Sequence, residues 1–465
     1  MAAGPVNVRT SVPIILGEPM HLPSISRRLT VLCATLLLTA GLAVSQATTA
    51  TAADSITDLN LGDVQGSGDT AAAGGKVFIA VEDRIVVASS QGVPTGAITG
   101  LAEPWGLASS ADGTRLYAAL RGSHELAEID TATLAITRRI DLTAYPCPSR
   151  LERSADRLWV SYGCPTVWGG GVLSLDMSET TPQPVPLPIS QTSGASVIAA
   201  AANTLLVAEN SRLQVYDLQN GTPALRGVID TDDLEIAHGW EDLAITADGT
   251  RVYATSGSIN DFEAWDLTTL SLIRSYGREE GIYNYRAIAV SPDGTRVAAS
   301  HGFGGEEEPV ALFDTATGAK IETFAASLHD VLRGSFTFSG TDLFAVTEAW
   351  SDVRHSYLWR MHGALLPVCK LTLTGPAAAR KYSTATFTGR LTEPDGSDPT
   401  VRQLAVSFRE MGQVTTLPDV TTNADGTFTF THVPYASGNL TYIVYRENTP
   451  DTRSCTASTR VSVRS

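Results

Sequence analysis

The stretch Pro104–Leu142, PWGLASSADGTRLYAALRGSHELAEIDTATLAITRRIDL, contains four short runs in which apolar and polar residues alternate. Turn residues separate the runs at Ala111–Gly113, at Arg121–His124 and at Asp130–Thr133. Alternation with a period of two predicts strands that bury one face, and the turns predict hairpins between them. Four antiparallel strands form one twisted sheet, which cannot bury its own core. The chain must therefore pack further sheets against this one.

The turn before the second strand of this unit recurs along the chain. Asp-Gly-Thr-Arg occupies residues 112–115, 248–251 and 293–296, and four weaker copies occur elsewhere. A repeat of roughly 40–50 residues with four strands per unit is typical of a β-propeller. Seven copies predict seven blades. Their second strands are expected to begin at Lys76, Arg115, Arg157, Thr204, Arg251, Arg296 and Asp342.

The Asp-Gly pairs are interpreted as turn formers rather than as metal ligands. Glycine adopts the positive φ that a tight hairpin needs, and the Asp side chain accepts a local hydrogen bond. The third strand of several units ends in an apolar residue followed by Asp, as at Ile129-Asp130 and Phe313-Asp314. These endings predict a second turn in each unit.

A propeller must close its ring, because an unpaired edge strand invites aggregation. The last repeat contains strand patterns near residues 335–338, 343–347 and 356–361. Ser55–Leu61 has the pattern of the fourth strand Ile136–Leu142, so we predict that this N-terminal strand completes the last blade. Ala364–Val368 is the alternative.

The segments YAALRGSHELAEIDTATLAITRRIDL, ITADGTRVYATSG and VSPDGTRVAAS resemble the repeats of the secreted, WD40-like YVTN β-propeller family. The resemblance covers most of residues 54–365, and about four of the seven repeats are good copies. It implies the fold. It carries over no catalytic residue, because members of the family have the repeat in common rather than one catalysed reaction.

The N-terminal region has the pattern of an export signal. Arg27-Arg28 precedes the apolar run Leu29–Val44, and Ala50-Thr51-Ala52 is a small-residue cleavage site. Residues 1–53 are therefore predicted to be a signal peptide, with Met20 as the expected start. The Arg pair leaves both general and twin-arginine export open. We expect a mature chain without a membrane span, either secreted or associated with the cell wall.

The net charge and the number of cysteines are consistent with an extracellular location. A net charge of −16 repels phosphate backbones, so nucleic acid is not an expected partner. An even number of cysteines in a mature secreted chain favours disulfides. Cys147 and Cys164 flank the hairpin turn predicted near residue 156, and Cys369 and Cys455 would tie the start of the C-terminal region to its last strand.

The repeat pattern ends near residue 366, and a different β pattern follows. About seven short strands are expected in residues 367–465, which suggests a β-sandwich. LTGPAAARKYSTATFTGRLT and NADGTFTFTHVPYASGNLTYIVY resemble bacterial Ig-like repeat domains of secreted surface proteins. That resemblance implies a spacer or adhesive unit. The expected fold is all-β: a seven-bladed β-propeller over residues 54–366, followed by a C-terminal Ig-like β-sandwich over 367–465.

Loops that join successive blades share one face of a propeller with the loops between second and third strands. Many aromatic, charged and imidazole side chains fall on these loops, including Trp168 and Trp350. Such groups can supply contact area and orient a ligand. Trp159, Trp265 and Trp359 fall within strand patterns and are expected in the core. The candidate ligand-binding residues are Trp105, His238, Trp240, Glu241, Tyr285, Arg286, His301 and His329.

Two functions remain open. The first is a non-catalytic binding protein, a monomer that recognises an extracellular protein or glycan through the loop face and uses the Ig-like domain as a spacer or adhesive module. The second is an extracellular enzyme of lactonase, lyase or hydrolase type, with a site at the central channel. The chain contains none of the metal-site, nucleophile or phosphate-loop motifs HExxH, GxSxG and Walker A. We therefore favour binding and expect no cofactor and no metal.

Overall fold

The computed structural model describes residues 54–61, 66–155, 157–165, 167–209, 211–218, 223–230, 240–256, 261–277, 285–301, 310–324, 329–350, 354–399, 401–410 and 413–465. The predicted signal peptide, residues 1–53, lies outside these ranges. All the regular secondary structure within these ranges consists of β-strands. None of the described segments forms a helix with the length and apolarity needed to cross a membrane.

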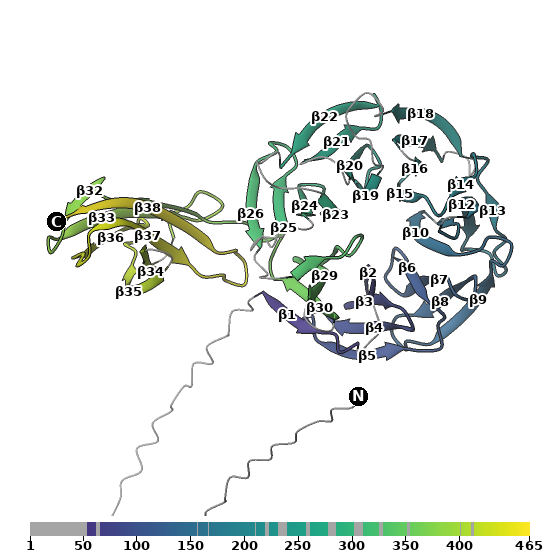
Figure 1. The fold of residues 1–465 in the computed structure, drawn as a ribbon, viewed down its shortest axis with the longest axis horizontal. Coiled ribbons are helices and arrows are strands. Elements are labelled where there is room, and N and C mark those ends of the chain that lie inside the picture. Colours follow the sequence, from purple (N-terminus) through teal and green to yellow (C-terminus); the bar gives the residue numbers. More distant parts are fainter. Residues whose placement is uncertain are drawn as a thin grey trace, which may run out of the picture. The chain divides into compact units, whose positions relative to one another are not determined.

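In the described chain up to residue 361 the strands form seven antiparallel sheets around a common axis (Figure 1). Six of them contain four consecutive strands in chain order, with the first strand innermost. The first three are β2 (Gly66–Ala73), β3 (Lys76–Val81), β4 (Arg84–Ser89), β5 (Pro94–Ile98); β6 (Pro104–Ser109), β7 (Arg115–Leu120), β8 (Glu125–Asp130), β9 (Ile136–Asp141); and β10 (Pro148–Ser154), β11 (Arg157–Tyr162), β12 (Trp168–Asp176), β13 (Val185–Pro186), with β14 (Thr192–Ser193) also on β12.

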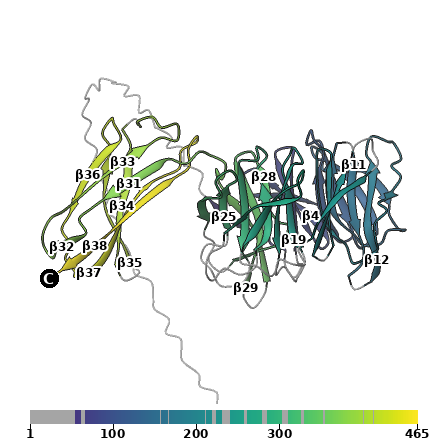
Figure 2. The same cartoon turned by 90° about the horizontal axis from the view of Figure 1, so that it is seen from above.

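The next three sheets repeat the pattern. They are β15 (Val197–Ala201), β16 (Thr204–Glu209), β17 (Arg212–Asp217), β18 (Ala224–Asp230); β19 (Trp240–Ile245), β20 (Arg251–Ser256), β21 (Phe262–Asp266), β22 (Ser271–Tyr276); and β23 (Tyr285–Val290), β24 (Arg296–His301), β25 (Val310–Asp314), β26 (Lys320–Phe324). Seen from the side, the strands run between the two faces of the ring (Figure 2).

The seventh sheet combines both ends of this region. β29 (Asp342–Trp350) pairs with β30 (Arg354–Met361), and β1 (Ser55–Asp58) pairs antiparallel with β30, placing Ser55 opposite Arg360. The inner position is divided between β27 (His329–Val331) and β28 (Thr337–Ser339), which both pair with β29. The N-terminal strand therefore covers the outer edge of β30.

The second strand of each sheet begins at the residue that the repeat aligned, from Lys76 in β3 to Asp342 in β29. The Asp-Gly turns explain this regularity. Asp112 Oδ1 accepts hydrogen bonds from Ser110 Oγ (2.6 Å) and Thr114 N (3.0 Å), and Gly113 has a φ of 68°. The same bonds recur at Asp248 and Asp293. A local turn thus sets the start of the strand that follows it.

The core lies between neighbouring sheets. Seven apolar clusters each join two successive sheets, and the last joins the seventh sheet to the first through Val77, Ile79, Phe344 and Leu358. Each sheet therefore buries both faces only because it has a neighbour on each side. This arrangement is a β-propeller.

Beyond residue 366 two sheets form a sandwich. One has the order β31-β33-β36 and the other β32-β38-β37-β34-β35. Phe387 from the first sheet packs with Phe408 and Tyr442 from the second. The strands are β31 (Lys370–Thr374), β32 (Ala378–Arg380), β33 (Ala385–Thr392), β34 (Gln403–Glu410), β35 (Gln413–Thr421), β36 (Thr427–His432), β37 (Gly438–Arg446) and β38 (Cys455–Arg464).

This sandwich differs in detail from the sequence expectation. The short strand β32 was not foreseen; it pairs parallel with the end of β38. β35 is nine residues long although the sequence pattern predicts only short strands here, because most of it is an exposed edge without a clear apolar alternation. Both predicted disulfides are present, Cys147–Cys164 and Cys369–Cys455.

Candidate functional site

The predicted candidate residues occupy different surroundings. Trp105 lies under the guanidinium of Arg121, which is 4.6 Å from the ring centroid. Glu241 forms an ion pair with Arg333. Tyr285 is 1 % exposed, belongs to the core between the fifth and sixth sheets, and donates a hydrogen bond to the carbonyl of Gly277 (3.3 Å).

The remaining candidates divide into three groups. Arg286, on β23, is partly buried. His238 lies outside the described residues, as do the side chains of His301 and His329. Trp240, at the start of β19, is 8 % exposed and lines a pocket. Of the candidates whose side chains the structure describes, only Trp240 borders this pocket.

That pocket, here called the Trp168 pocket, has a volume of about 550 Å³ and lies where the third, fourth and fifth sheets meet. It is formed by the start of β12, the connection before β15, the end of β16 and the start of β19. All of these chain segments lie on the face where the loops between sheets and the loops between second and third strands meet. Its lining is Trp168, Ser190, Gln191, Thr192, Ser193, Gly194, Ala195, Ser196, Val197, Ala208, Glu209 and Trp240.

The wall of this pocket is held by close backbone packing. β14 pairs with the start of β12, so that Trp168 lies opposite Ser193 and Gly170 opposite Thr192. A Cβ on Gly170 would lie 2.0 Å from the carbonyl oxygen of Gly194, so glycine is required at this position. The disulfide Cys147–Cys164 anchors the adjoining loop, and Val167 N donates to Cys164 O (3.2 Å).

The pocket combines a large exposed ring with buried polar atoms. The side chain of Trp168 is 75 % exposed. Trp240 Nε1, Glu209 Oε1 and Ser196 Oγ are buried and have no hydrogen-bond partner within the described part of the chain. The other oxygen of Glu209, Oε2, accepts from Gln214 Nε2 (2.9 Å). Burial raises the pKa of Glu209, while the bond from Gln214 acts in the opposite direction.

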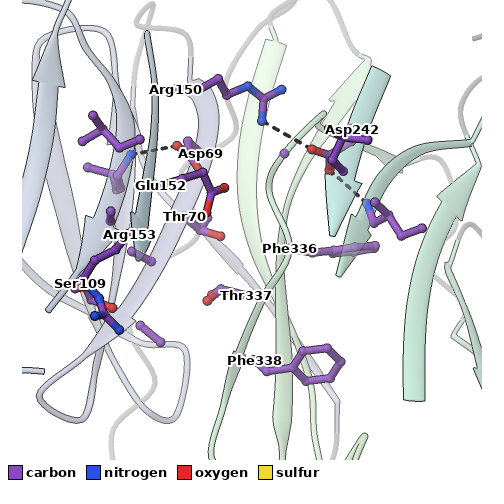
Figure 3. A pocket seen from close by; sticks show the side chains of 18 residues that line it. Asp69, Thr70, Ser109, Arg150, Glu152, Arg153, Asp242, Phe336, Thr337 and Phe338 are labelled. Atoms are coloured by element: carbon purple, nitrogen blue, oxygen red, sulfur yellow. Dashed lines mark hydrogen bonds and ion pairs between the residues drawn. The ribbon is translucent and has the colours of Figure 1, made fainter. Parts of the chain in front are cut away.

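A second cavity, the channel pocket, has a volume of about 380 Å³ and lies among the innermost strands. Figure 3 shows Asp69, Glu152 and Asp242 in it, with Arg150 directed toward Asp242. Arg150 Nη1 and Asp242 Oδ1 are 3.4 Å apart. These carboxylates come from β2, β10 and β19, the inner strands of the first, third and fifth sheets.

Each carboxylate of the channel pocket accepts a backbone hydrogen bond from the inner strand of the next sheet. Leu107 N donates to Asp69 (2.8 Å), and Ile288 N donates to Asp242 (3.0 Å). Glu152 accepts from the backbone of Ala200. Carboxylates bound in this way link sheets in pairs around the axis, which is a structural role.

The surroundings of these carboxylates favour their neutral forms. Burial raises the pKa of Asp69 to about 7, and Arg150 opposes the effect. Burial, together with the charges of Asp69 and Asp242, raises the pKa of Glu152 to about 8. The pKa of Asp242 is also raised by burial, against the attraction of Arg150. Within the described ranges no group of three His, Cys, Asp or Glu residues is arranged to hold a metal ion.

The repeat pattern places Trp168 on the loop face among many other residues, and it does not point to Ser196, Glu209 or the channel carboxylates. Glu209 ends an otherwise apolar strand pattern, LLVAE, which was a usable signal. Asp69, Glu152 and Asp242 occupy inner strands, where a charge is unusual. Their convergence could not be foreseen, because it depends on which sheets face each other across the axis.

Comparison with known proteins adds structural likenesses only. No protein-family model matches the chain, and no curated protein does. The β-propeller domain of Cps50 (Swd1) from Myceliophteria thermophila is 13 % identical, covers 66 % of this chain and 99 % of that one, and has a TM-score of 0.49. Kluyveromyces lactis Hsv2 with its complete loop 6CD is 12 % identical over 63 % of this chain and 98 % of that one, with a TM-score of 0.43. The propeller assignment rests on the sheets and the clusters between them.

Proposed function

We propose that this chain is an exported, non-catalytic binding protein. In this proposal a seven-bladed propeller of the YVTN type presents its loop face as the recognition surface, and an Ig-like domain serves as a spacer or adhesive module. The apolar run after Arg27-Arg28, the small-residue cleavage site and the two disulfides support the extracellular assignment.

The observation that carries the binding role is the Trp168 pocket. A tryptophan that is 75 % exposed, beside buried hydrogen-bonding atoms without partners in the described chain, offers a ligand both apolar contact area and free hydrogen-bonding capacity. A ligand would cover the indole and satisfy the polar atoms, so a binding role explains both features together.

The proposal is tested by retention on natural material. Mature wild-type protein, Trp168→Ala and Trp105→Ala would be incubated with cell-wall material and with the secreted polymers and proteins of the producing cell. We expect Trp168→Ala to lose retention and Trp105→Ala to keep it, because Trp105 lies outside the pocket under Arg121. Equal retention of all three proteins would refute the assignment of the pocket.

The predicted export of the protein is tested separately. The protein recovered outside the cell should begin close to Asp54, as the predicted cleavage site requires. An intracellular protein that retains residues 1–53 would contradict it.

A further inference from the structure

We propose that the Trp168 pocket binds a neutral saccharide. This inference rests on the proposed function and names the class of ligand. Three features carry it: the exposed indole of Trp168, the unpartnered polar atoms of the pocket, and the scarcity of charge in its lining.

Trp168 provides a flat apolar surface on a backbone that is held in place. Its backbone pairs with Ser193, and Gly194 N donates to the carbonyl of the preceding Val167 (3.3 Å). The backbone that carries the indole therefore belongs to a paired strand, so no loop has to be ordered when a ligand packs on the ring. One face of a pyranose ring is lined by C–H groups, and such a face packs on an aromatic ring through apolar contact.

The buried polar atoms match the hydroxyls of a sugar. The indole N–H of Trp240 is a donor only, Glu209 Oε1 is an acceptor when ionised, and Ser196 Oγ can act as either. Within the described chain none of these atoms has a hydrogen-bond partner. Every sugar hydroxyl can donate and accept, so a saccharide offers both the acceptor that the indole N–H needs and the donor that the carboxylate needs. A purely apolar ligand would leave all three atoms unpaired.

The charge of the pocket selects among polar ligands. Glu209 is the one ionisable side chain among the described residues that line it, and no Lys, Arg or His is among them. Among these described lining residues, phosphorylated or acidic ligands would thus meet a carboxylate and no cation. A cationic peptide would meet a single carboxylate whose pKa is raised by burial, a weak anchor. A neutral saccharide avoids both costs, and a volume of about 550 Å³ is within the ordinary range for small-ligand sites.

The test uses the mature chain and defined probes. Neutral tetrasaccharides of glucose, mannose, galactose, xylose and N-acetylglucosamine would be titrated by calorimetry, and the corresponding neutral polysaccharides would be examined by affinity electrophoresis. We expect at least one to bind, with an affinity nearly independent of salt, because no ion pair forms.

Substitutions locate the site. Trp168→Ala should weaken binding about tenfold or more, and Trp168→Phe should restore most of it, because a smaller ring still stacks. Trp240→Phe removes the indole N–H and keeps an aromatic core residue, so binding should weaken about fivefold while the melting temperature changes little. Ser196→Ala should act in the same direction. Trp105→Ala is the matched control and should bind as the wild type does.

The outcomes separate this inference from the proposed function. Binding of a probe that is lost in Trp168→Ala supports both. Failure of every probe, combined with Trp168-dependent retention of a protein partner from the producing cell, overturns the saccharide inference and leaves the binding function standing. Probes that bind all variants equally overturn the saccharide inference. If nothing is retained in a Trp168-dependent way, both fail.

Discussion

Glu152 offers a direct test of the electrostatics of the channel pocket through the variant Glu152→Gln. The glutamine keeps the shape of the side chain and can still accept the backbone hydrogen bond from Ala200. It removes only the ability to ionise. Any pH-dependent difference in stability between the two proteins therefore reports the ionisation of Glu152.

The sign follows from the raised pKa. Burial raises the pKa of Glu152 from 4.5 to about 8, so the folded protein keeps this proton at pH values where the unfolded chain has released it. Between those values the folded state binds more protons, and the free energy of unfolding falls as the pH rises. The contribution of this carboxyl is fully present below about pH 4.5 and is lost by about pH 8.

The size can be estimated from the shift. A change of roughly 3–4 pKa units would correspond to about 5 kcal/mol at about 1.4 kcal/mol per unit. Glu152 is partly accessible from the channel pocket, and water there screens the charge, so we expect about 2 kcal/mol. At pH 9 the variant should thus be more stable than the wild type by about 2 kcal/mol, and near pH 4.5 the two should be similar.

Denaturation of both mature proteins between pH 4 and pH 9 measures this difference. Asp112→Asn is the control: the hydrogen bonds from Ser110 and Thr114 lower the pKa of Asp112 to about 2, so its contribution is constant above about pH 4 and falls only in more acidic solution. A pH-independent difference for Glu152→Gln, or a variant less stable than the wild type at pH 9, would refute the reasoning.

Three further predictions concern packing, a buried ion pair and a disulfide. Gly170→Ala places a Cβ 2.0 Å from a backbone oxygen, so it should lower the melting temperature and separate β14 from β12. Gly96→Ala, with no atom within 4 Å, is the control and should do neither. Calorimetry would measure the melting temperatures, and saccharide titration would report damage to the pocket. Arg360→Met removes the 2.6 Å partner of the buried Asp342 carboxylate, which keeps the hydrogen bond from Gly363 N (2.7 Å), and should cost about 3 kcal/mol in chemical denaturation; a loss below about 1 kcal/mol would contradict it. Replacing both cysteines of Cys147–Cys164 by serine should cost about 3 kcal/mol and weaken ligand binding, and unchanged binding would show that the disulfide does not support the pocket.

Much of the propeller could be predicted because its determinants are local. Alternation marks the strands, and an Asp-Gly turn sets where the next strand begins, as at Arg115, Arg251 and Arg296. Each of these signals acts within a single hairpin. The core tryptophans were predicted for the same reason: Trp159 and Trp359 lie within apolar strand patterns and are each 1 % exposed.

The site could be predicted only in outline. Placing Trp168 and Trp240 on the loop face followed from the repeat, and the same logic grouped them with Trp105 and Tyr285. The structure puts Trp105 under Arg121 and buries Tyr285 beside Phe262, whereas Trp168 and Trp240 border one pocket. A loop position tells which face a residue is near, but not whether its side chain turns toward solvent or into the core.

The sequence by itself determined the repeating β units, their turns and the pairing of cysteines, because these depend on contacts within one hairpin or one domain. The tertiary structure alone decided the chemistry of the two pockets. Glu209 meets Trp168 and Trp240 because three successive sheets converge there, and Asp69, Glu152 and Asp242 share the channel pocket because their strands are innermost. Residues so far apart in the chain meet only once neighbouring sheets have packed, and no periodicity in the sequence records that meeting.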